Sequence, residues 1–366
     1  MRSLFEPGKI GDLVLPNRFV RSATWEGLAQ EDGSCSPKLI DLMEKIAQGN
    51  TGLIISGYAF INRDSQAAPF QLGAYSDDLL PGLTEMAETV HKAGGKILMQ
   101  LAHGGLFASP QLTGQEPVGP SVTTTEKGPM GREMTKKEIN RTINAFRDGA
   151  VRAKKAGFDG IQIHAAHGYL LSQFLSPFFN KREDEYGGSV ENRARIVLEI
   201  FQSVREAVGN RFPVLVKINA EDFLDGGFSV IEMLQVARML EQSGVDAIEL
   251  SGGTILGLYI GNPNISFSRV GDSGVYYEEA AKRYKREIGI PLMLVGGIRS
   301  CEVSRRLVDE VVTDYVSLCR PLIREPDLIK RWESGDTRDA ECVSDNACFQ
   351  PGIEGKGVHC IHVESQ

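Results

Sequence analysis

The chain is organised around one stretch, Ile161-Gln162-Ile163-His164-Ala165-Ala166-His167-Gly168-Tyr169-Leu170-Leu171. It begins as a strand, because apolar residues alternate with Asp159 and Gln162 after a break at Gly157. It ends in two imidazoles and a phenol, where a strand would run out into a loop. The stretch therefore predicts a β-strand that carries polar side chains to one end of a sheet.

These polar side chains are those of His164, His167 and Tyr169. Each can donate a hydrogen bond without carrying a full charge at pH 7, because imidazole has an ordinary pKa of about 6.5 and phenol one of about 10. Such a set suits a site that holds an oxyanion or carbonyl oxygen and gives a proton to a neighbouring carbon. Two alternatives stay open. The imidazoles could bind zinc, although such pairs usually lie four residues apart on a helix, or they could be hydrogen-bonded loop residues without catalytic function.

Length and composition exclude several classes of protein. The 366 residues are typical of one α/β barrel with appendages, and the 42% of apolar residues suffice for a large core. A net charge of −8 disfavours binding to nucleic acid or to an anionic membrane surface. No apolar run is long enough to cross a membrane, and Met1–Glu6 lacks the features of a signal peptide. We therefore expect a cytoplasmic protein whose 6 cysteines are thiols or metal ligands rather than disulfides.

A short β-rich run, a polar loop and an amphipathic helical segment repeat from about residue 17 to residue 333. The predicted strands are Phe19–Ala23, Leu53–Ser56, Ile97–Leu101, Gly160–His164, Val214–Ile218, Ala247–Leu250, Leu292–Val295 and Tyr315–Leu318. The predicted helices are Lys38–Gln48, Leu79–Lys92, Lys136–Lys155, Asn192–Ala207, Val230–Gln242, Glu278–Glu287, Cys301–Asp309 and Pro326–Trp332. Thr135 and Glu138 form a capping-box sequence in front of the third helix.

Strands that alternate with helices in this way predict a closed (β/α)8 TIM barrel of the α/β class. The alternative is an open doubly wound sheet, which should carry a Gly-x-Gly-x-x-Gly sequence behind its first strand. The run after Phe19–Ala23 is Thr24-Trp25-Glu26-Gly27 instead. We therefore expect a barrel over residues 1–333 and a short Cys-containing extension over residues 334–366 that is not an independent domain.

Chemistry in such a barrel lies at the carboxyl ends of the strands, with a phosphate site in the loops after strands seven and eight. In this sequence those loops contain Gly296, Gly297 and Arg320. The glycines let backbone N–H groups approach an anion closely, and the guanidinium adds a fixed fork of donors. Their joint occurrence favours a phosphate site over an ordinary glycine turn with a surface arginine.

Several further motifs are longer and more specific. They are Leu15-Pro16-Asn17-Arg18, Gln100-Leu101-Ala102-His103-Gly104-Gly105, the stretch from Ile163 to Leu170, and the run Phe174-Leu175-Ser176-Pro177 with Asn180, Arg182, Asp184-Glu185-Tyr186-Gly187-Gly188-Ser189 and Glu191-Asn192-Arg193. With these motifs the chain resembles the old yellow enzyme family of FMN-dependent oxidoreductases, over residues 4 to about 328. It is similar in particular to the barrel domain of dienoyl-CoA reductase-like and trimethylamine dehydrogenase-like members.

The resemblance implies an FMN that lies across the mouth of the barrel, with NADH or NADPH as electron donor. It assigns the isoalloxazine edge to Gln100 and to Lys217, which stands where many relatives have arginine. It implies that His164 and His167 bind the carbonyl oxygen of an activated alkene and that Tyr169 supplies a proton. The other cofactor residues that it implies, beside His164, are Ser22, Ala23, Thr24, Trp25 and Tyr58 for the flavin and Gly296, Gly297, Cys319 and Arg320 for the phosphate.

The sequence departs from the family at three places. Trp25 stands where relatives often have cysteine or threonine; we expect its indole to face the flavin, the alternative being ordinary packing in the barrel wall. The run His103-Gly104-Gly105-Leu106 lacks an expected arginine. The third departure is a cysteine run that resembles the [4Fe–4S] segment of larger relatives, with Asp345 in place of one cysteine and with Cys342, Cys348 and Cys360 retained. We expect a packed remnant there; an iron–sulfur cluster and zinc are the alternatives.

The resemblance implies transfer of a hydride from NAD(P)H through flavin to the C=C bond of an α,β-unsaturated carbonyl compound, as in an ene-reductase. The alternative within the family is oxidation of an amine or a saturated carbonyl compound. A non-catalytic flavin-binding barrel is disfavoured, because a carrier needs no proton donor at Tyr169. A metal-dependent lyase or aldolase would need clustered acidic ligands at the strand ends, which the sequence lacks. We expect a small-molecule substrate, no nucleic acid and no membrane as partners, and we leave self-association into a homo-oligomer open.

Overall fold

The computed structural model, which describes residues 3–125, 128–270 and 274–362, contains a closed barrel of parallel strands. Neighbouring strands pair in the order β11, β12, β13, β14, β15, β3, β4 and β6, and β6 pairs with β11 to close the ring. They are β3 (Phe19–Arg21), β4 (Leu53–Ile55), β6 (Ile97–Ala102), β11 (Gly160–Ala165), β12 (Val214–Asn219), β13 (Ala247–Ser251), β14 (Leu292–Val295) and β15 (Tyr315–Leu318). Each predicted strand is present to within about two residues at either end, and the predicted (β/α)8 barrel is confirmed.

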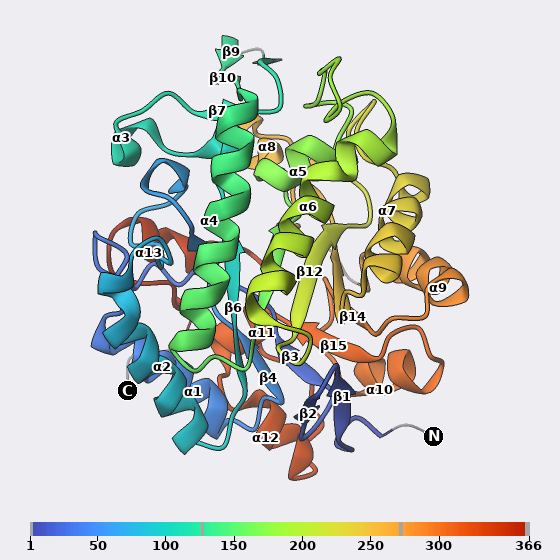
Figure 1. Cartoon of the computed structure of the whole chain (residues 1–366). Helices are drawn as coiled ribbons and strands as arrows, with labels where there is room; N and C mark the ends of the chain where they lie inside the picture. The colour runs from blue at the N-terminus through green and yellow to red at the C-terminus, as the bar shows by residue number, and fades with distance from the viewer. Residues whose placement is uncertain (1–2, 126–127, 271–273, 363–366) are drawn as a thin grey trace.

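Helices surround the barrel, as Figure 1 shows. They are α1 (Pro37–Gln48), α2 (Leu80–Lys92), α4 (Lys136–Lys155), α6 (Val190–Val208), α7 (Val230–Ser243), α9 (Glu278–Glu287), α10 (Cys301–Asp309), α11 (Arg320–Arg324) and α12 (Leu328–Glu333). The predicted capping box begins α4: the Thr135 hydroxyl accepts the N–H of Glu138, and the Glu138 carboxylate accepts the N–H of Thr135. The predicted helix Pro326–Trp332 begins two residues late, at Leu328.

The core has two parts, one inside the barrel and one between the barrel and the helices. The inner part consists of apolar side chains from the barrel strands. A hairpin of β1 (Gly8–Ile10) and β2 (Leu13–Leu15) closes one end of the barrel and buries Ile10 and Leu15 against this inner core. The hairpin was not predicted, because strands of three residues are too short to show a period. Because the hairpin covers this end of the barrel, the other end is the one that is open for a site.

Further short elements lie outside the strand–helix repeat. They include β5 (Ala59–Phe60), α3 (Pro110–Thr113), β7 (Val118–Gly119), β8 (Thr123–Thr125), β9 (Gly128–Met130), β10 (Arg132–Glu133), α5 (Leu170–Leu175) and α8 (Leu256–Ile260). Figure 1 shows several of them (α3, β7, β9, β10, α5 and α8) in its upper part, at the open end of the barrel. Single 3-10 turns lie at Arg63–Ser65, Asp77–Leu79, Gly105–Phe107, Pro263–Ile265 and Ala347–Phe349.

The C-terminal extension returns to the mouth of the barrel and contains the short helix α13 (Gln350–Ile353). The Val358 N–H donates to the Glu26 carbonyl (2.7 Å), and Arg299 Nη1 donates to the Cys342 carbonyl (3.1 Å). The extension is thus attached to the loops that follow β3 and β14.

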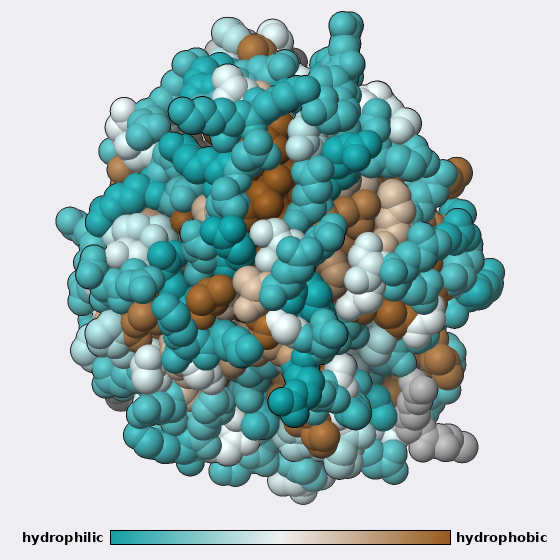
Figure 2. All heavy atoms as spheres, in the orientation of Figure 1, coloured by the Kyte–Doolittle hydropathy of each residue, from teal (hydrophilic) through white to brown (hydrophobic). Residues whose placement is uncertain are grey.

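The face of the molecule in Figure 2 is mainly hydrophilic, with apolar residues visible between the polar ones. This agrees with the amphipathic helices, since α4 buries Ile139 and Phe146. Among the residues that the structure describes, no helix is both long enough and apolar enough to cross a membrane.

Candidate active site

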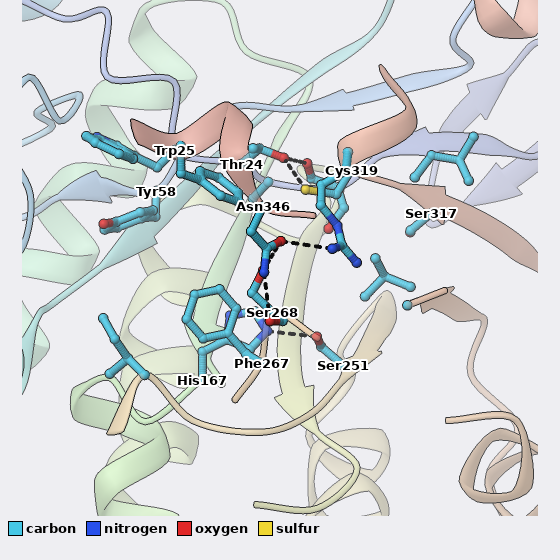
Figure 3. Close-up of a pocket in the computed structure, with 18 of the residues that line it drawn as sticks. Thr24, Trp25, Tyr58, His167, Ser251, Phe267, Ser268, Ser317, Cys319 and Asn346 are labelled. Carbon is cyan, nitrogen blue, oxygen red and sulfur yellow. Dashed lines mark hydrogen bonds between the residues drawn. The ribbon is translucent and has the colours of Figure 1, made fainter. Parts of the chain in front are cut away.

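A cavity of about 800 Å³ lies at the carboxyl ends of the barrel strands. The residues predicted for the cofactor and for catalysis all line it: Ser22, Ala23, Thr24, Trp25, Tyr58, Gln100, His164, His167, Tyr169, Lys217, Gly296, Gly297, Cys319 and Arg320. They are far apart in the sequence, but a parallel barrel brings the ends of its strands together. Figure 3 shows several of them around the cavity.

A chain of buried polar side chains lies beneath the cavity, inside the barrel. Gln100 Nε2 donates to Gln162 Oε1 (2.6 Å), and Gln162 Nε2 donates to Glu249 Oε2 (2.9 Å). The Lys217 ammonium lies 3.4 Å from the same Glu249 oxygen and donates to Ser22 Oγ (2.8 Å). In the strand register Gln100 pairs with Gln162, and Lys217 pairs with Glu249. The floor of the cavity therefore presents a lysine charge that a carboxylate balances.

Glu249 had no role in the sequence analysis. Its side chain is fully buried, and its Oε1 has no hydrogen-bond partner among the described residues. Burying an unpaired carboxylate costs several kcal/mol, so its contact with Lys217 is important for the fold. An acidic residue in the otherwise apolar strand Ala247–Ser251 was the signal that could have revealed it.

His164 brings a neutral imidazole to the cavity. It lies in β11, and its buried Nδ1 has no hydrogen-bond partner among the described residues. Burial, with a smaller effect of the Lys217 ammonium, holds the pKa of His164 well below its ordinary value. A neutral imidazole with an unpaired nitrogen can take one hydrogen bond from a ligand or give one to it.

His167 is fixed by contacts from the last residues of β12 and β13 and from the loop that follows β13. Its φ of 64° lies in the left-handed region, and its N–H donates to Asn219 Oδ1 (3.0 Å). Its Nε2 lies 2.7 Å from Ser251 Oγ, and its ring stacks on Phe267 with centroids 4.9 Å apart. Asn219 Nδ2 in turn donates to buried Asp222 (2.8 Å). Burial, followed by Lys217, also lowers the pKa of His167 well below its ordinary value. Neither Phe267 nor Asp222 was predicted for the site, because the folding of loops brings them here.

Tyr169 and Tyr58 face each other in the wall of the cavity. Their hydroxyls are 3.3 Å apart and their ring centroids 5.3 Å apart. The Tyr169 ring also lies 5.2 Å from that of His164. Burial raises the pKa of Tyr169 to about 12 and the pKa of Tyr58 well above its ordinary value. Both phenols therefore keep their protons at neutral pH.

The residues predicted for a phosphate lie together at another side of the cavity. Gly296 and Gly297 have φ values of 117° and 75°, which residues with a side chain rarely adopt. Arg320 Nη1 donates to the Ser344 carbonyl (3.2 Å) and to Asn346 Oδ1 (2.8 Å). These two partners belong to the C-terminal extension and were not predicted from the sequence.

Trp25 lines the cavity beside the extension. Its Nε1 donates to the Pro69 carbonyl (3.1 Å), and its ring lies close to Gly352 of α13. Nearby, the Thr24 hydroxyl donates to Cys319 Sγ (3.1 Å). The indole therefore lies between the cavity and the extension, and its contact with a flavin stays a prediction.

The cysteines of the extension border a separate, much smaller pocket. Cys342, Cys348 and Cys360 line it with Asp345, which pairs with His362 (2.6 Å). Burial raises the pKa of Cys348 to about 12, so this thiol is protonated at neutral pH. Within residues 3–125, 128–270 and 274–362, no cluster of three or more metal-ligating side chains is present. The predicted remnant stays a prediction.

Residues 3–339 match the NADH:flavin oxidoreductase / NADH oxidase family. The chain belongs to this family of oxidoreductases. A family member named NADH oxidase, from Thermoanaerobacter brockii, is 39% identical over 350 residues, which are 94% of this chain and 53% of that protein.

Solved structures agree with this family. A 2-naphthoyl-CoA reductase complex superposes with a TM-score of 0.90 at 26% identity, over 98% of this chain and 56% of that one. An old yellow enzyme homologue from Zymomonas mobilis gives a TM-score of 0.78 at 27% identity, over 92% and 94% of the two chains. The resemblance to the old yellow enzyme family is confirmed. The chain spans about half the length of the NADH oxidase and of the naphthoyl-CoA reductase.

Proposed function

We propose that this family member carries FMN and uses NADH or NADPH to reduce the C=C bond of an α,β-unsaturated carbonyl compound. The observation that carries the proposal is the set of neutral donors His164, His167 and Tyr169 in the wall of one cavity. Membership of the family supports the flavin and the nicotinamide. The donors support a substrate whose oxygen gains negative charge during the reaction.

The residues of the cavity fit FMN in size and in chemistry. A volume of about 800 Å³ lies in the usual range of ~300–1,000 Å³ for ligand sites. Lys217 and Gln100 would hold the polar edge of the isoalloxazine, and Gly296, Gly297 and Arg320 would hold the phosphate. Ser22, Ala23, Thr24, Trp25 and Tyr58 would lie along the flavin, with His164 beside it and Cys319 near the phosphate. Bound FMN would supply two-electron redox chemistry between the nicotinamide and the alkene.

His164 and His167 would hold the carbonyl oxygen of the substrate. Ser251 occupies one ring nitrogen of His167, which leaves the other nitrogen for a ligand, and His164 Nδ1 is unpaired. Because both imidazoles are neutral, they can donate to an oxygen as its negative charge grows without placing two full charges in a buried site. A well-placed donor of this kind stabilises a transition state by about 2.7–4 kcal/mol.

Tyr169 would give its proton to the carbon next to the carbonyl group. Its pKa of about 12 keeps the proton on the phenol in the resting site, with the Tyr58 hydroxyl 3.3 Å away. A positioned general acid typically contributes about 10²–10⁴-fold to the rate.

An anaerobic absorbance titration tests the proposal. The purified protein should show a flavin spectrum, lose it with NADH or NADPH, and regain it with a cyclic enone such as 2-cyclohexenone. Arg320→Ala should retain less FMN, because its planar fork of donors matches phosphate oxygens. Arg324→Ala is the matched control, since Arg324 lies in the same short helix but pairs with Glu341 (2.7 Å). Protein without flavin, or a bleached flavin that the enone does not reoxidise, would contradict the proposal.

A further inference from the structure

Three segments that are far apart in the sequence meet at the side chain of Asn346. Its Oδ1 accepts hydrogen bonds from Arg320 Nη1 (2.8 Å) and from Ser268 Oγ (2.8 Å). Its Nδ2 donates to the Ser268 carbonyl (3.0 Å). Arg320 follows the last barrel strand, Ser268 lies in the loop after β13, and Asn346 lies in the extension. We call these three residues the Asn346 clasp; all of them line the cavity, and Figure 3 shows Asn346 next to Ser268.

The clasp fixes one edge of the Arg320 guanidinium. Nη1 donates to Asn346 and also to the carbonyls of Ser344 (3.2 Å) and Arg269 (2.8 Å). Nη2 donates to the Tyr276 hydroxyl (3.3 Å). Because the guanidinium is planar and rigid, three acceptors on one nitrogen set the direction of the whole fork. Two of those three acceptors belong to the extension, so the orientation of Arg320 depends on it.

Asparagine is suited to this position for two reasons. The backbone of Asn346 has φ of 65°, a conformation that asparagine and glycine adopt more readily than most residues. Its amide also offers an acceptor for Arg320 and a donor for the Ser268 carbonyl at once, whereas a carboxylate would offer no donor. Asn346→Gly therefore removes the clasp while the backbone conformation stays accessible.

We propose that Asn346 is a positioning residue of the cofactor site, which orients Arg320 toward the phosphate of FMN and makes FMN retention depend on the C-terminal extension. This inference rests on the proposed function, and it gives the extension a role that does not involve its cysteines.

The test is a titration of apoprotein with FMN, followed by quenching of flavin fluorescence, for wild type, Asn346→Gly, Arg320→Ala and the double variant. Asn346→Gly should weaken FMN binding about tenfold, the loss expected for a hydrogen bond to a charged group. In the Arg320→Ala background the same substitution should have no further effect, because Asn346 acts through Arg320. Val343→Ala is the control, since Val343 is an exposed residue of the same extension outside the clasp.

Melting temperatures of the apoproteins show whether the variants fold. If Asn346→Gly does not fold, Ser268→Ala takes its place. This variant keeps Asn346 and should weaken FMN binding by a smaller factor, again only when Arg320 is present. Unchanged FMN binding, or an equal loss with and without Arg320, would overturn the inference. A wild-type chain that binds no FMN would instead overturn the proposed function.

Discussion

Replacing Tyr169 by phenylalanine should slow one half of the catalytic cycle and spare the other. The substitution removes the phenolic hydroxyl and keeps the ring, whose centroid lies 5.2 Å from that of His164. Reduction of the flavin by NADH or NADPH needs no proton from Tyr169, so its rate should stay at the wild-type value. Reoxidation by an enone needs that proton and should slow.

The structure sets the expected magnitudes. Loss of a positioned general acid predicts reoxidation about 10²–10⁴-fold slower. The cost in stability should be small, because the hydroxyl donates to Tyr58 over 3.3 Å and such a bond is worth about 0.5–1.5 kcal/mol. Since burial raises the pKa of Tyr169 to about 12, the wild-type donor stays protonated, and its reoxidation rate should not fall between pH 7 and about pH 9.

Anaerobic stopped-flow absorbance measures the two half-reactions separately. Tyr58→Phe is the matched control, because it removes the other hydroxyl of the same pair and leaves Tyr169 intact. Its reoxidation rate should lie close to that of wild type. If Tyr169→Phe impaired flavin reduction as much as reoxidation, or if Tyr58→Phe had the larger effect on reoxidation, Tyr169 would not be the proton donor.

Three further predictions concern the cavity wall, the extension and the core. Trp25→Ala should admit bulkier enones and change the flavin spectrum. An unchanged substrate range, together with a lower melting temperature and a loss of about 3–5 kcal/mol in the free energy of unfolding, as for a buried aromatic residue, would assign Trp25 to packing alone. Protein purified without oxygen should contain no stoichiometric iron, and an analysis that gives about four irons per chain would instead indicate a cluster with Asp345 as a ligand. Burial lowers the pKa of His103 to about 4. In the unfolded chain this imidazole takes up a proton near pH 6.5, whereas in the folded chain it stays neutral down to about pH 4. Through this linkage His103 alone should lower the free energy of unfolding by about 2–3 kcal/mol from pH 7 to pH 4.5, and chemical denaturation of His103→Gln should show a fall that is smaller than that of wild type by about this amount.

The barrel was predictable because its signals are local. Each barrel strand is a short apolar run between turn residues, and the capping box at Thr135 and Glu138 marks the start of α4 within one turn of helix. The N-terminal hairpin escaped prediction because its strands have three residues each. The helix α12 begins at Leu328, after a turn in which the Leu328 N–H donates to the Glu325 carbonyl (3.1 Å).

The composition of the cavity was predictable from the resemblance, but its internal contacts were not. The pairing of Lys217 with Glu249 arises from the register of two strands, which no single segment encodes. The support that Asp222 gives to Asn219 depends on the loop after β12, in which the Asp222 carboxylate also accepts the N–H of Phe228 (2.9 Å). The role of Asn346 could not be predicted from the sequence, because its contact with Arg320 requires the extension to return to the barrel mouth.

The most direct test of the account is the anaerobic stoichiometry of the reaction with 2-cyclohexenone. The account predicts that each NADH or NADPH oxidised yields one molecule of cyclohexanone, and that the His164→Ala, His167→Ala double variant loses this activity while its flavin is still reduced by the nicotinamide. Nicotinamide oxidation without formation of the saturated ketone, or full enone reduction by the double variant, would contradict it.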